Sequence, residues 1–266
     1  MQKILDRKQP LKDSDVPESL ELLCKLPPNN RPLDDFKVTH YAANSLANGQ
    51  QLHDSVINSS INLILHWLGI NSSIAAASTF FQTKIGSSWT LSSKGKSKVL
   101  DQKQLTELAK YKHINYYSSN PKHVLDHDVI IIPMNVPNTH WYLFIVDTFN
   151  KVMKLYDSLT PSGFTRDQEE MFVKLSNFFN ASTYAKVTDS PTNRWRLVNE
   201  GCPKQTAEKG KSGLGVDCGI FVLLCITSYL QSKTIQFDQA YIYEQKIREK
   251  IFLNLYNGDF SKYPLL

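Results

Sequence analysis

Cysteine is scarce in this 266-residue chain, and no cysteine spacing suggests a metal or redox site. The four cysteines are Cys24, Cys202, Cys218 and Cys225, and no two of them form a C-x-x-C pair. The sequence also lacks an apolar run directly after Met1, so it shows no secretory signal peptide. We therefore expect reduced thiols and an intracellular location, in the nucleus, the cytoplasm or both.

Long hydrophobic runs and strongly basic patches are absent as well. The longest apolar run, Ile220–Ile226, falls far short of the roughly 20 residues that a membrane-spanning helix needs. The net charge of +5 is mild, and no basic patch is interleaved with aromatic residues. We therefore expect neither a membrane nor a nucleic acid as partner. What the chain does have is 41% hydrophobic residues, enough for a sizeable core, and a charge compatible with an acidic protein partner.

The chain divides into a peripheral part and a patterned part. Residues 1–40 mix charges with prolines and show little periodicity, which predicts an N-terminal extension with one short helix at Pro17–Lys25. Residues 41–266 carry regular patterns and form the predicted domain, with a Ser/Gly/Lys-rich loop at residues 84–98. Its helices are predicted from an N-cap at Asp54 to Gly69, at Gln102–Tyr111, after a capping box at Thr165–Gln168, at Gly219–Leu230 and at Gln239–Leu255.

Short β-branched and aromatic runs in the middle of the chain predict strands. They lie at Val129–Ile132, Trp141–Val146, Val152–Tyr156 and Thr183–Thr188. The helix after the capping box has its apolar residues on one face, whereas the helix at Gly219–Leu230 is apolar nearly all round and is predicted to lie in the core. Strands in the middle with helices before and after predict an α+β fold with a short mixed central sheet flanked by helices.

One predicted β-hairpin brings a histidine and an aspartate together. Its turn is predicted at Asp147–Asn150, so that Val146 opposes Lys151. In that register His140 lies directly opposite Asp157, with Cβ atoms about 4.5–5.5 Å apart. A carboxylate there can accept the imidazole N–H and hold the ring in one tautomer.

Cys218 is predicted at the junction of a glycine-containing loop and the buried helix. The N–H groups and the positive dipole end of a helix N-terminus stabilise a thiolate, and Gly219 leaves room for a substrate backbone. A cysteine there, paired with a histidine that an aspartate holds, is what nucleophilic acyl transfer needs. The structural alternative for Cys218 is a small buried side chain, which is also our prediction for Cys225, two turns further along the helix.

An oxyanion hole is the remaining requirement of this chemistry. The backbone N–H of Cys218 can supply one donor, and the side-chain amide of Gln205 is the candidate for the second. Losing one such donor costs about 2.7–4 kcal/mol of transition-state stabilisation.

Taken together, these segments resemble the ubiquitin-like-protein proteases, also called SUMO or sentrin-specific proteases, of the adenain-like clan of cysteine peptidases. The resemblance implies a papain-like/adenain-like fold, with residues 41–266 as the catalytic domain. It covers roughly residues 45–255 in the chain order His, Asp, Gln, Cys. It rests on the segments Leu52–Asn58, Thr79–Phe81, Thr139–Trp141, Tyr156–Ser158, Cys202–Gln205 and Asp217–Phe221.

The resemblance also implies how a substrate is recognised. Such proteases clamp the C-terminal Gly-Gly of the modifier in a narrow tunnel roofed by tryptophans, which only glycine is slim enough to enter. Trp141 matches one roof residue, and Asp54 matches a position at the modifier-binding surface. The second roof tryptophan would fall at Gln51, so that half of the roof is absent or comes from Trp67 or Trp89.

The spacing before the nucleophile departs from the family pattern. Twelve residues separate Gln205 from Cys218, which is longer than the family's interval. Either this stretch forms a loop, or Gln205 is a surface amide and Ser212 occupies the in-register site. Trp141 could instead be an aromatic residue that packs within its strand, and Asp54 could instead serve only as a helix N-cap.

We predict a monomeric thiol isopeptidase, without cofactor or metal, that cleaves after the Gly-Gly of SUMO or a related ubiquitin-like modifier. It would process precursors, remove conjugates or do both. Two alternatives stay open: a deubiquitinase-type or acetyltransferase effector that acts in a host cell, and a degenerate module that binds the modifier without cutting it. A zinc site at His123 and His127 is disfavoured, because Pro121 opposes a helix there and no third ligand is evident.

Overall fold

The described residues fall into two compact units. The first unit holds the described residues up to 69, residues 139–141 and those from 202 onward, and the second holds those of 73–136 and 142–201. A computed structural model of the chain describes residues 38–46, 50–69, 73–88, 126–136, 139–160, 162–182, 194–206 and 216–266.

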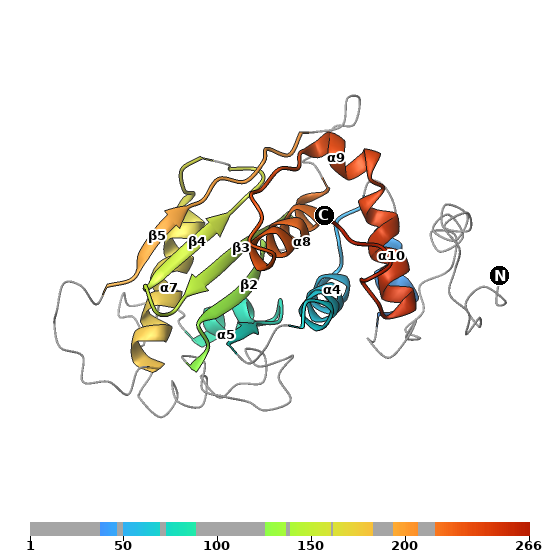
Figure 1. Cartoon of the computed structure of the whole chain (residues 1–266). Helices are drawn as coiled ribbons and strands as arrows, with labels where there is room; N and C mark the ends of the chain where they lie inside the picture. Colours follow the sequence, from blue (N-terminus) through green and yellow to red (C-terminus); the bar gives the residue numbers. More distant parts are fainter. Residues whose placement is uncertain are drawn as a thin grey trace. The chain divides into compact units, whose positions relative to one another are not determined.

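A five-stranded sheet forms the centre of the second unit (Figure 1). Its strands follow one another in sequence order, with β1 parallel to β2, β3 antiparallel to β4, and β4 parallel to β5. The sheet is therefore mixed, which confirms the predicted α+β fold class; the two short outer strands, β1 and β5, were not predicted. The strand bounds are β1 Ile74–Ala76, β2 Val129–Val136, β3 His140–Asp147, β4 Val152–Tyr156 and β5 Arg196–Asn199.

The register of the β3–β4 hairpin differs from the prediction. Asp147 pairs with Val152 and Leu143 pairs with Tyr156, so the loop runs over residues 148–151. The side chain of Asp147 accepts hydrogen bonds from the backbone and side-chain nitrogens of Asn150, both at 2.8 Å, which fixes the turn one residue later than predicted. Continuing this register brings Asp157 opposite Tyr142, so the predicted direct opposition of His140 and Asp157 is wrong.

The error is a slip of two residues along the strand. Because side chains alternate with a period of two, such a slip keeps each side chain on the face that was predicted for it. A slip of one residue would have moved every side chain of the strand to the other face.

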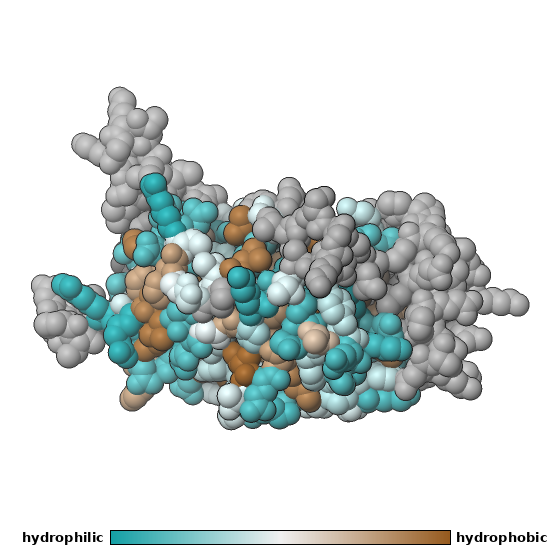
Figure 2. Space-filling view, turned by 90° about the horizontal axis from the view of Figure 1, so that it is seen from above, coloured by the Kyte–Doolittle hydropathy of each residue, from teal (hydrophilic) through white to brown (hydrophobic). Residues whose placement is uncertain are grey.

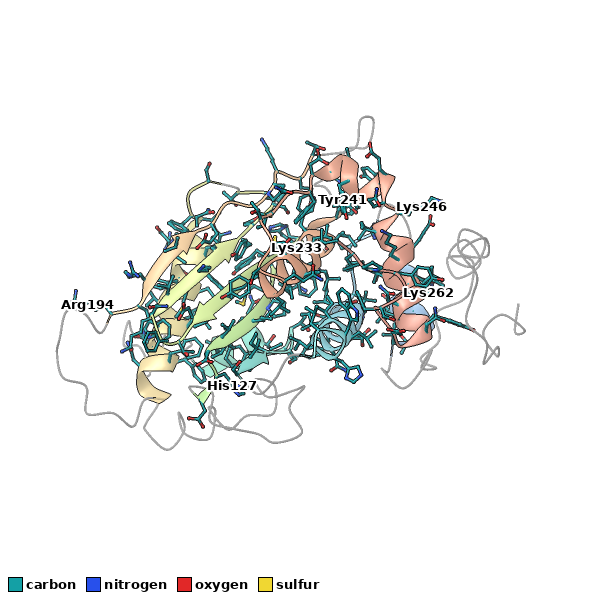
Figure 3. The ribbon with its side chains drawn as sticks, viewed as in Figure 1. His127, Arg194, Lys233, Tyr241, Lys246 and Lys262 are labelled. Carbon is teal, nitrogen blue, oxygen red and sulfur yellow. The ribbon has the colours of Figure 1, made fainter. Side chains whose placement is uncertain are left out.

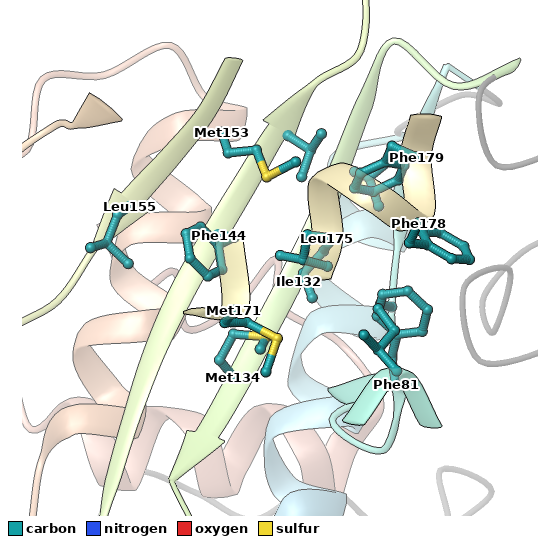
Figure 4. Packing of buried hydrophobic residues seen from close by; sticks show 14 of the residues in the cluster. Phe81, Ile132, Met134, Phe144, Met153, Leu155, Met171, Leu175, Phe178 and Phe179 are labelled. Carbon is teal, nitrogen blue, oxygen red and sulfur yellow. The ribbon is translucent and has the colours of Figure 1, made fainter. Parts of the chain in front are cut away.

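Helices α5 (Phe81–Ser88) and α7 (Arg166–Ser182) supply aromatic side chains to the second unit's core. The rings of Phe81 and Phe178 meet edge to face at 5.5 Å, beside buried side chains of β2, β3 and β4 (Figure 4). The predicted apolar face of α7 is confirmed, since its members are buried or packed against this cluster: Met171, Phe172, Leu175, Phe178 and Phe179.

The predicted capping box opens α7. The amide N–H of Gln168 donates to Thr165 Oγ1 at 3.3 Å, and the amide N–H of Thr165 donates to Gln168 Oε1 at 2.9 Å. This reciprocal pair leaves the Gln168 side-chain NH₂ group to bind elsewhere.

Helices make up most of the regular structure described for the first unit, which also holds the first two residues of β3. Helix α8 is buried along its length from Cys218 to Ser228, which confirms the predicted core helix. It contacts α4, which in turn contacts α10 (Figure 1). The helix bounds are α3 His40–Ala43, η2 Asn44–Leu46, α4 Asp54–Trp67, α8 Cys218–Leu230, α9 Gln239–Glu244 and α10 Ile247–Asn257.

Two helix predictions in the first unit need correction. The single helix predicted at Gln239–Leu255 is two helices, because Lys246 takes a left-handed backbone conformation with φ 50° between α9 and α10 (Figure 3). Asp54 is the first helical residue of α4 and not its N-cap. The N-cap is His53, whose Nδ1 accepts the Ser55 backbone N–H at 3.2 Å.

Several sequence predictions fall on residues that the structure does not describe. The helices at Pro17–Lys25 and Gln102–Tyr111 and the strand at Thr183–Thr188 lie outside the described residues. The boundary at residue 40 stays a prediction. The loop predicted at 84–98 is wrong for residues 84–88, which are helical, and its remaining residues lie outside the described part of the chain.

Hydrophobic side chains form small separate patches among hydrophilic ones on the face that Figure 2 shows. None of the described helices has the length and apolar content needed to cross a membrane. Among the described residues, no group of three or more His, Cys, Asp or Glu side chains is arranged to hold a metal ion. His127 is buried, and His123 lies outside the described part of the chain.

Candidate active site

Cys218 is the first residue of α8, where the sequence predicted it. The helix is apolar and buried, and its first-turn N–H groups point toward the preceding chain. Cys218 is buried.

The N-cap of α8, Asp217, does not cap the helix with its side chain. An aspartate in this position usually accepts an N–H from the first turn. Here the carboxylate is turned to other donors: Arg248 Nη2 at 2.6 Å, Gln239 Nε2 at 2.6 Å and Tyr243 Oη at 3.0 Å. The side chains of Asp217 and Arg248 are 4% and 6% exposed, so their ion pair is buried.

His140 begins β3 and belongs to the same unit as Cys218. The residues on either side of His140 are both fixed by hydrogen bonds to the chain before α4. The amide of Gln51 donates to the Thr139 carbonyl at 2.5 Å, and the Trp141 indole N–H donates to the Leu52 carbonyl at 3.0 Å. His140 itself is 6% exposed, so the imidazole is held in a buried, defined place.

Trp141 was predicted as a roof residue of a substrate tunnel, and Gln51 as the position at which the second roof tryptophan is missing. Trp141 is buried, with its indole oriented by Leu52, and Gln51 is half-buried, with its amide used on the backbone next to His140. Trp67, one suggested replacement for the second tryptophan, packs at 6.4 Å from the ring of Phe260. Trp89, the other, lies outside the described residues.

Gly219 lies where α8 packs closely against the start of α4. A Cβ atom at this position would lie 3.0 Å from Leu52 Cβ and 3.1 Å from Ile57 Cδ1. The glycine therefore lets α8 pack closely against the start of α4, and the prediction that it leaves room for a substrate backbone stays a prediction. Leu52 thus touches the helix of Cys218 with its side chain and orients Trp141 with its carbonyl.

Asp157 belongs to the second unit, directly after β4, and is 2% exposed. Its Oδ1 accepts the backbone N–H groups of Leu159 at 2.8 Å and Thr160 at 3.3 Å. Its Oδ2 accepts the Thr160 hydroxyl at 2.9 Å and the side-chain amide of Gln168. Neutral donors from three residues therefore hold the carboxylate in one orientation.

The buried carboxylate affects a neighbouring phenol. Burial raises the pKa of Tyr142 well above its ordinary value, and the negative charges of Asp157 and Asp167 raise it further. Tyr142 is therefore a neutral phenol at any physiological pH. The pairing of Asp157 with His140 stays a prediction.

Gln205 is buried, in the described segment that ends at Thr206. The segment is tied to α8 by the thiols of Cys202 and Cys225, whose sulfur atoms are 3.6 Å apart. Burial raises the pKa of Cys225, as does its hydrogen bond with Cys202, so Cys225 is an inert core thiol as predicted. Ser212 lies outside the described residues, and the choice between it and Gln205 as oxyanion donor stays open.

The structure adds three residues to the site that sequence reasoning missed. Gln168 was recognised as part of a capping box but not as a partner of Asp157. Leu52 gave no polar signal, because it acts through its backbone carbonyl. Arg248 was placed on an amphipathic helix, and its partner Asp217 is 31 residues away, so no local pattern could reveal the pair.

Comparison with known protein families identifies the family of this chain. Residues 50–260 match a family model described as the Ulp1 protease family, C-terminal catalytic domain, which confirms the family resemblance predicted from the motifs. No curated protein sequence matches the chain.

Solved structures show the same fold. A SUMO protease Ulp1 with its catalytic cysteine oxidised to a sulfonic acid is 18% identical with a TM-score of 0.67, covering 94% of this chain and 97% of that one. The C-terminal Ulp1 protease domain in complex with SMT3, the yeast ortholog of SUMO, is 20% identical with a TM-score of 0.63 and the same coverage. A Chaetomium thermophilum Ulp1-like SUMO protease catalytic domain is 18% identical with a TM-score of 0.63, covering 97% and 94%.

Proposed function

This chain belongs to the Ulp1 protease family, and from that premise we propose that it is a thiol isopeptidase that cleaves after the C-terminal Gly-Gly of SUMO or a related ubiquitin-like modifier. The observation that supports this most is the position of Cys218, at the first residue of a buried helix inside the matched catalytic domain. SUMO is favoured as the modifier because the solved proteins of this fold include a Ulp1 protease domain in complex with SMT3.

The first half of the proposed reaction forms an acyl-enzyme. His140 takes the proton of the Cys218 thiol, and the thiolate attacks the carbonyl carbon of the modifier's terminal glycine. Asp157 orients the imidazole and stabilises it once it carries the proton. The tetrahedral intermediate then collapses, the C–N bond breaks, and His140 returns its proton to the leaving amine.

The second half releases the modifier. His140 takes a proton from a water molecule, and the resulting hydroxide attacks the thioester carbonyl carbon. The C–S bond breaks, His140 gives its proton to the leaving Cys218 sulfur, and the modifier leaves with a C-terminal carboxyl group that ionises. In both halves the negative oxygen accepts hydrogen bonds from the Cys218 N–H and the Gln205 amide, each worth about 2.7–4 kcal/mol in the transition state.

Trp141 and Gln51 have different parts in this proposal. The indole of Trp141 forms the wall that admits only the slim Gly-Gly tail, and its orientation is fixed by the Leu52 carbonyl. The half-buried amide of Gln51 holds the backbone before His140 in place and contributes to the wall beside it. Asp54, in the first turn of α4, is partly exposed and offers a charge to the modifier's surface.

The test is hydrolysis of modifiers that carry a fluorogenic amide at the C-terminus, with SUMO, ubiquitin and a third ubiquitin-like modifier in parallel. We expect cleavage of SUMO by the wild-type chain and a loss of about 10⁴-fold or more in Cys218→Ala. Cys225→Ala is the matched control, because it also removes a thiol from α8, two turns away from Cys218.

The outcome of the panel separates the candidate functions. Cleavage of ubiquitin alone would replace SUMO by ubiquitin as the substrate. Equal activity of the wild type and Cys218→Ala would refute the assignment of the nucleophile. Tight binding of a modifier without cleavage would mean a degenerate binding module.

A further inference from the structure

We propose that Arg248 is a positioning residue for the active site: its buried guanidinium joins the N-terminus of the Cys218 helix to the chain segment that fixes the strand of His140. The role proposed for the site rests on the protease activity inferred above, whereas the contacts of Arg248 are properties of the first unit alone. No reacting atom is touched by Arg248 in this account.

The guanidinium contacts two segments that lie far apart in the sequence. Toward α8, Nε and Nη2 donate to Asp217 Oδ1 at 2.9 and 2.6 Å, and Nη2 donates to the Val216 carbonyl at 3.1 Å. Toward the chain before α4, Nη1 donates to the Ser45 carbonyl at 3.1 Å and Nη2 donates to the Gln50 carbonyl at 3.0 Å. One side chain therefore joins these two segments by hydrogen bonds.

The segment that Arg248 binds leads directly to the histidine. After Gln50 the chain continues into Gln51, whose amide binds the Thr139 carbonyl, and then into Leu52, whose carbonyl binds the Trp141 indole. These two bonds lie on either side of His140. A continuous series of hydrogen bonds and peptide links thus runs from the residue before Cys218, through the guanidinium, to the residues that flank His140.

Arg248 also controls where the charge of Asp217 points. An N-cap aspartate that is free to turn accepts an N–H from the first helical turn, and its negative charge then lies beside the helix N-terminus. Here Arg248, Gln239 and Tyr243 hold the carboxylate, and it makes no cap hydrogen bond. The positive end of α8 is therefore left for the Cys218 thiolate and the oxyanion.

Only arginine has the geometry for these contacts. Its planar fork presents five N–H donors in fixed directions, whereas lysine offers one flexible ammonium group. Arg248→Lys therefore keeps the positive charge for Asp217 and loses part of the set of backbone contacts. This substitution separates positioning from simple charge compensation.

The experiment compares wild type with Arg248→Lys by three measurements. Circular dichroism and thermal unfolding report folding, steady-state cleavage of the SUMO fluorogenic amide reports kcat and KM, and mass spectrometry reports the rate of Cys218 alkylation by iodoacetamide at pH 7. We expect a folded protein with kcat lower by about 10- to 100-fold and KM within about twofold, because a displacement of about 1 Å at a reacting group costs that much. Alkylation should slow by about two- to fivefold, the size of a charge effect at a helix end.

Arg166→Lys is the matched control, since Arg166 forms an exposed pair with Glu170 and should leave all three measurements unchanged. A folded Arg248→Lys with wild-type kcat and wild-type alkylation overturns the proposal. If Arg248→Lys does not fold, Tyr243→Phe decides: it removes one hydrogen bond to Asp217, and kcat should fall about two- to fivefold at constant KM. An unchanged kcat in Tyr243→Phe then overturns it.

The alkylation rate distinguishes this proposal from the proposed function. If no modifier is cleaved by the wild type, the protease assignment fails, yet the slower alkylation of Cys218 in Arg248→Lys still supports the positioning role. If modifiers are cleaved but the alkylation rate and kcat do not respond to either substitution, only the positioning role fails.

Discussion

The two units of this chain hold their key side chains by different means. In the first unit, a buried ion pair of Asp217 and Arg248 sits directly before Cys218 and binds three backbone carbonyls. In the second unit, neutral groups of Leu159, Thr160 and Gln168 donate hydrogen bonds to the Asp157 carboxylate.

The difference follows from what each side chain must do. In the proposed reaction Asp157 is the charge that orients His140, so a cation beside it would compete with the imidazole for the carboxylate. Neutral donors orient it and leave its charge available. Next to Cys218 the negative charge of Asp217 would destabilise the thiolate. A cation that holds this carboxylate away from the helix end avoids that effect.

The largest effect is expected from breaking the ion pair of the first unit. Asp217→Ala leaves the Arg248 charge buried without its partner, so we expect a loss of about 3–5 kcal/mol in the free energy of unfolding. Urea denaturation measures it. The matched control is Glu170→Ala, which breaks an exposed pair and should cost less than about 0.5 kcal/mol. Equal losses in both variants would show that the buried pair has no special weight.

A smaller effect is expected from the neutral cage of the second unit. Gln168→Leu removes one donor from Asp157 and one acceptor from the capping box, which should cost about 1–3 kcal/mol and lower kcat about tenfold. Thr165→Ala weakens only the capping box, at about 1 kcal/mol, and leaves the bond to Asp157 in place. Comparable kcat values for the two variants would mean that Gln168 does not act on Asp157.

The close approach of α8 and the start of α4 is tested by a substitution that we expect to have an effect of similar size. Gly219→Ala places a Cβ 3.0 Å from Leu52 Cβ, and we expect a loss of about 1–3 kcal/mol together with lower kcat. Gly163→Ala, in the second unit, has open space but a φ of +83°, so it should cost about 1–2 kcal/mol with no change in kcat. A Gly219→Ala variant with full activity would show that α8 tolerates displacement.

The smallest effect concerns the N-cap of α4. His53→Ala removes the acceptor for the Ser55 N–H and should cost about 0.5–1 kcal/mol, whereas His53→Asn keeps an acceptor and should cost less. Thermal unfolding of the two variants is the measurement. An equal loss in both would assign the stabilising role of His53 to its ring contact with Tyr41 at 5.7 Å instead.

Local sequence patterns predicted those elements that are stabilised by their own residues. The capping box at Thr165–Gln168, the strand Val152–Tyr156 and the core helix after Cys218 each have a complete local signal, and the structure has all three. The strands β1 and β5 have three and four residues, too few for any period to show.

Features that depend on distant residues could not be predicted. The turn between β3 and β4 shifted by one residue because the Asp147 side chain binds Asn150, and several turn types fit the same sequence. The close packing around Gly219 depends on Leu52, which is far away in the sequence. The contacts of Arg248 join residues up to 203 positions apart, which no spacing rule covers.

The most direct test of the whole account is covalent labelling of the wild-type chain by SUMO that carries a C-terminal electrophile in place of its terminal carboxylate. Intact-mass measurement followed by peptide mapping gives both the stoichiometry and the modified residue. We expect one SUMO per chain, attached to Cys218, and no adduct in Cys218→Ala. Absence of an adduct with SUMO and its relatives, or attachment at Cys24, Cys202 or Cys225, would contradict it.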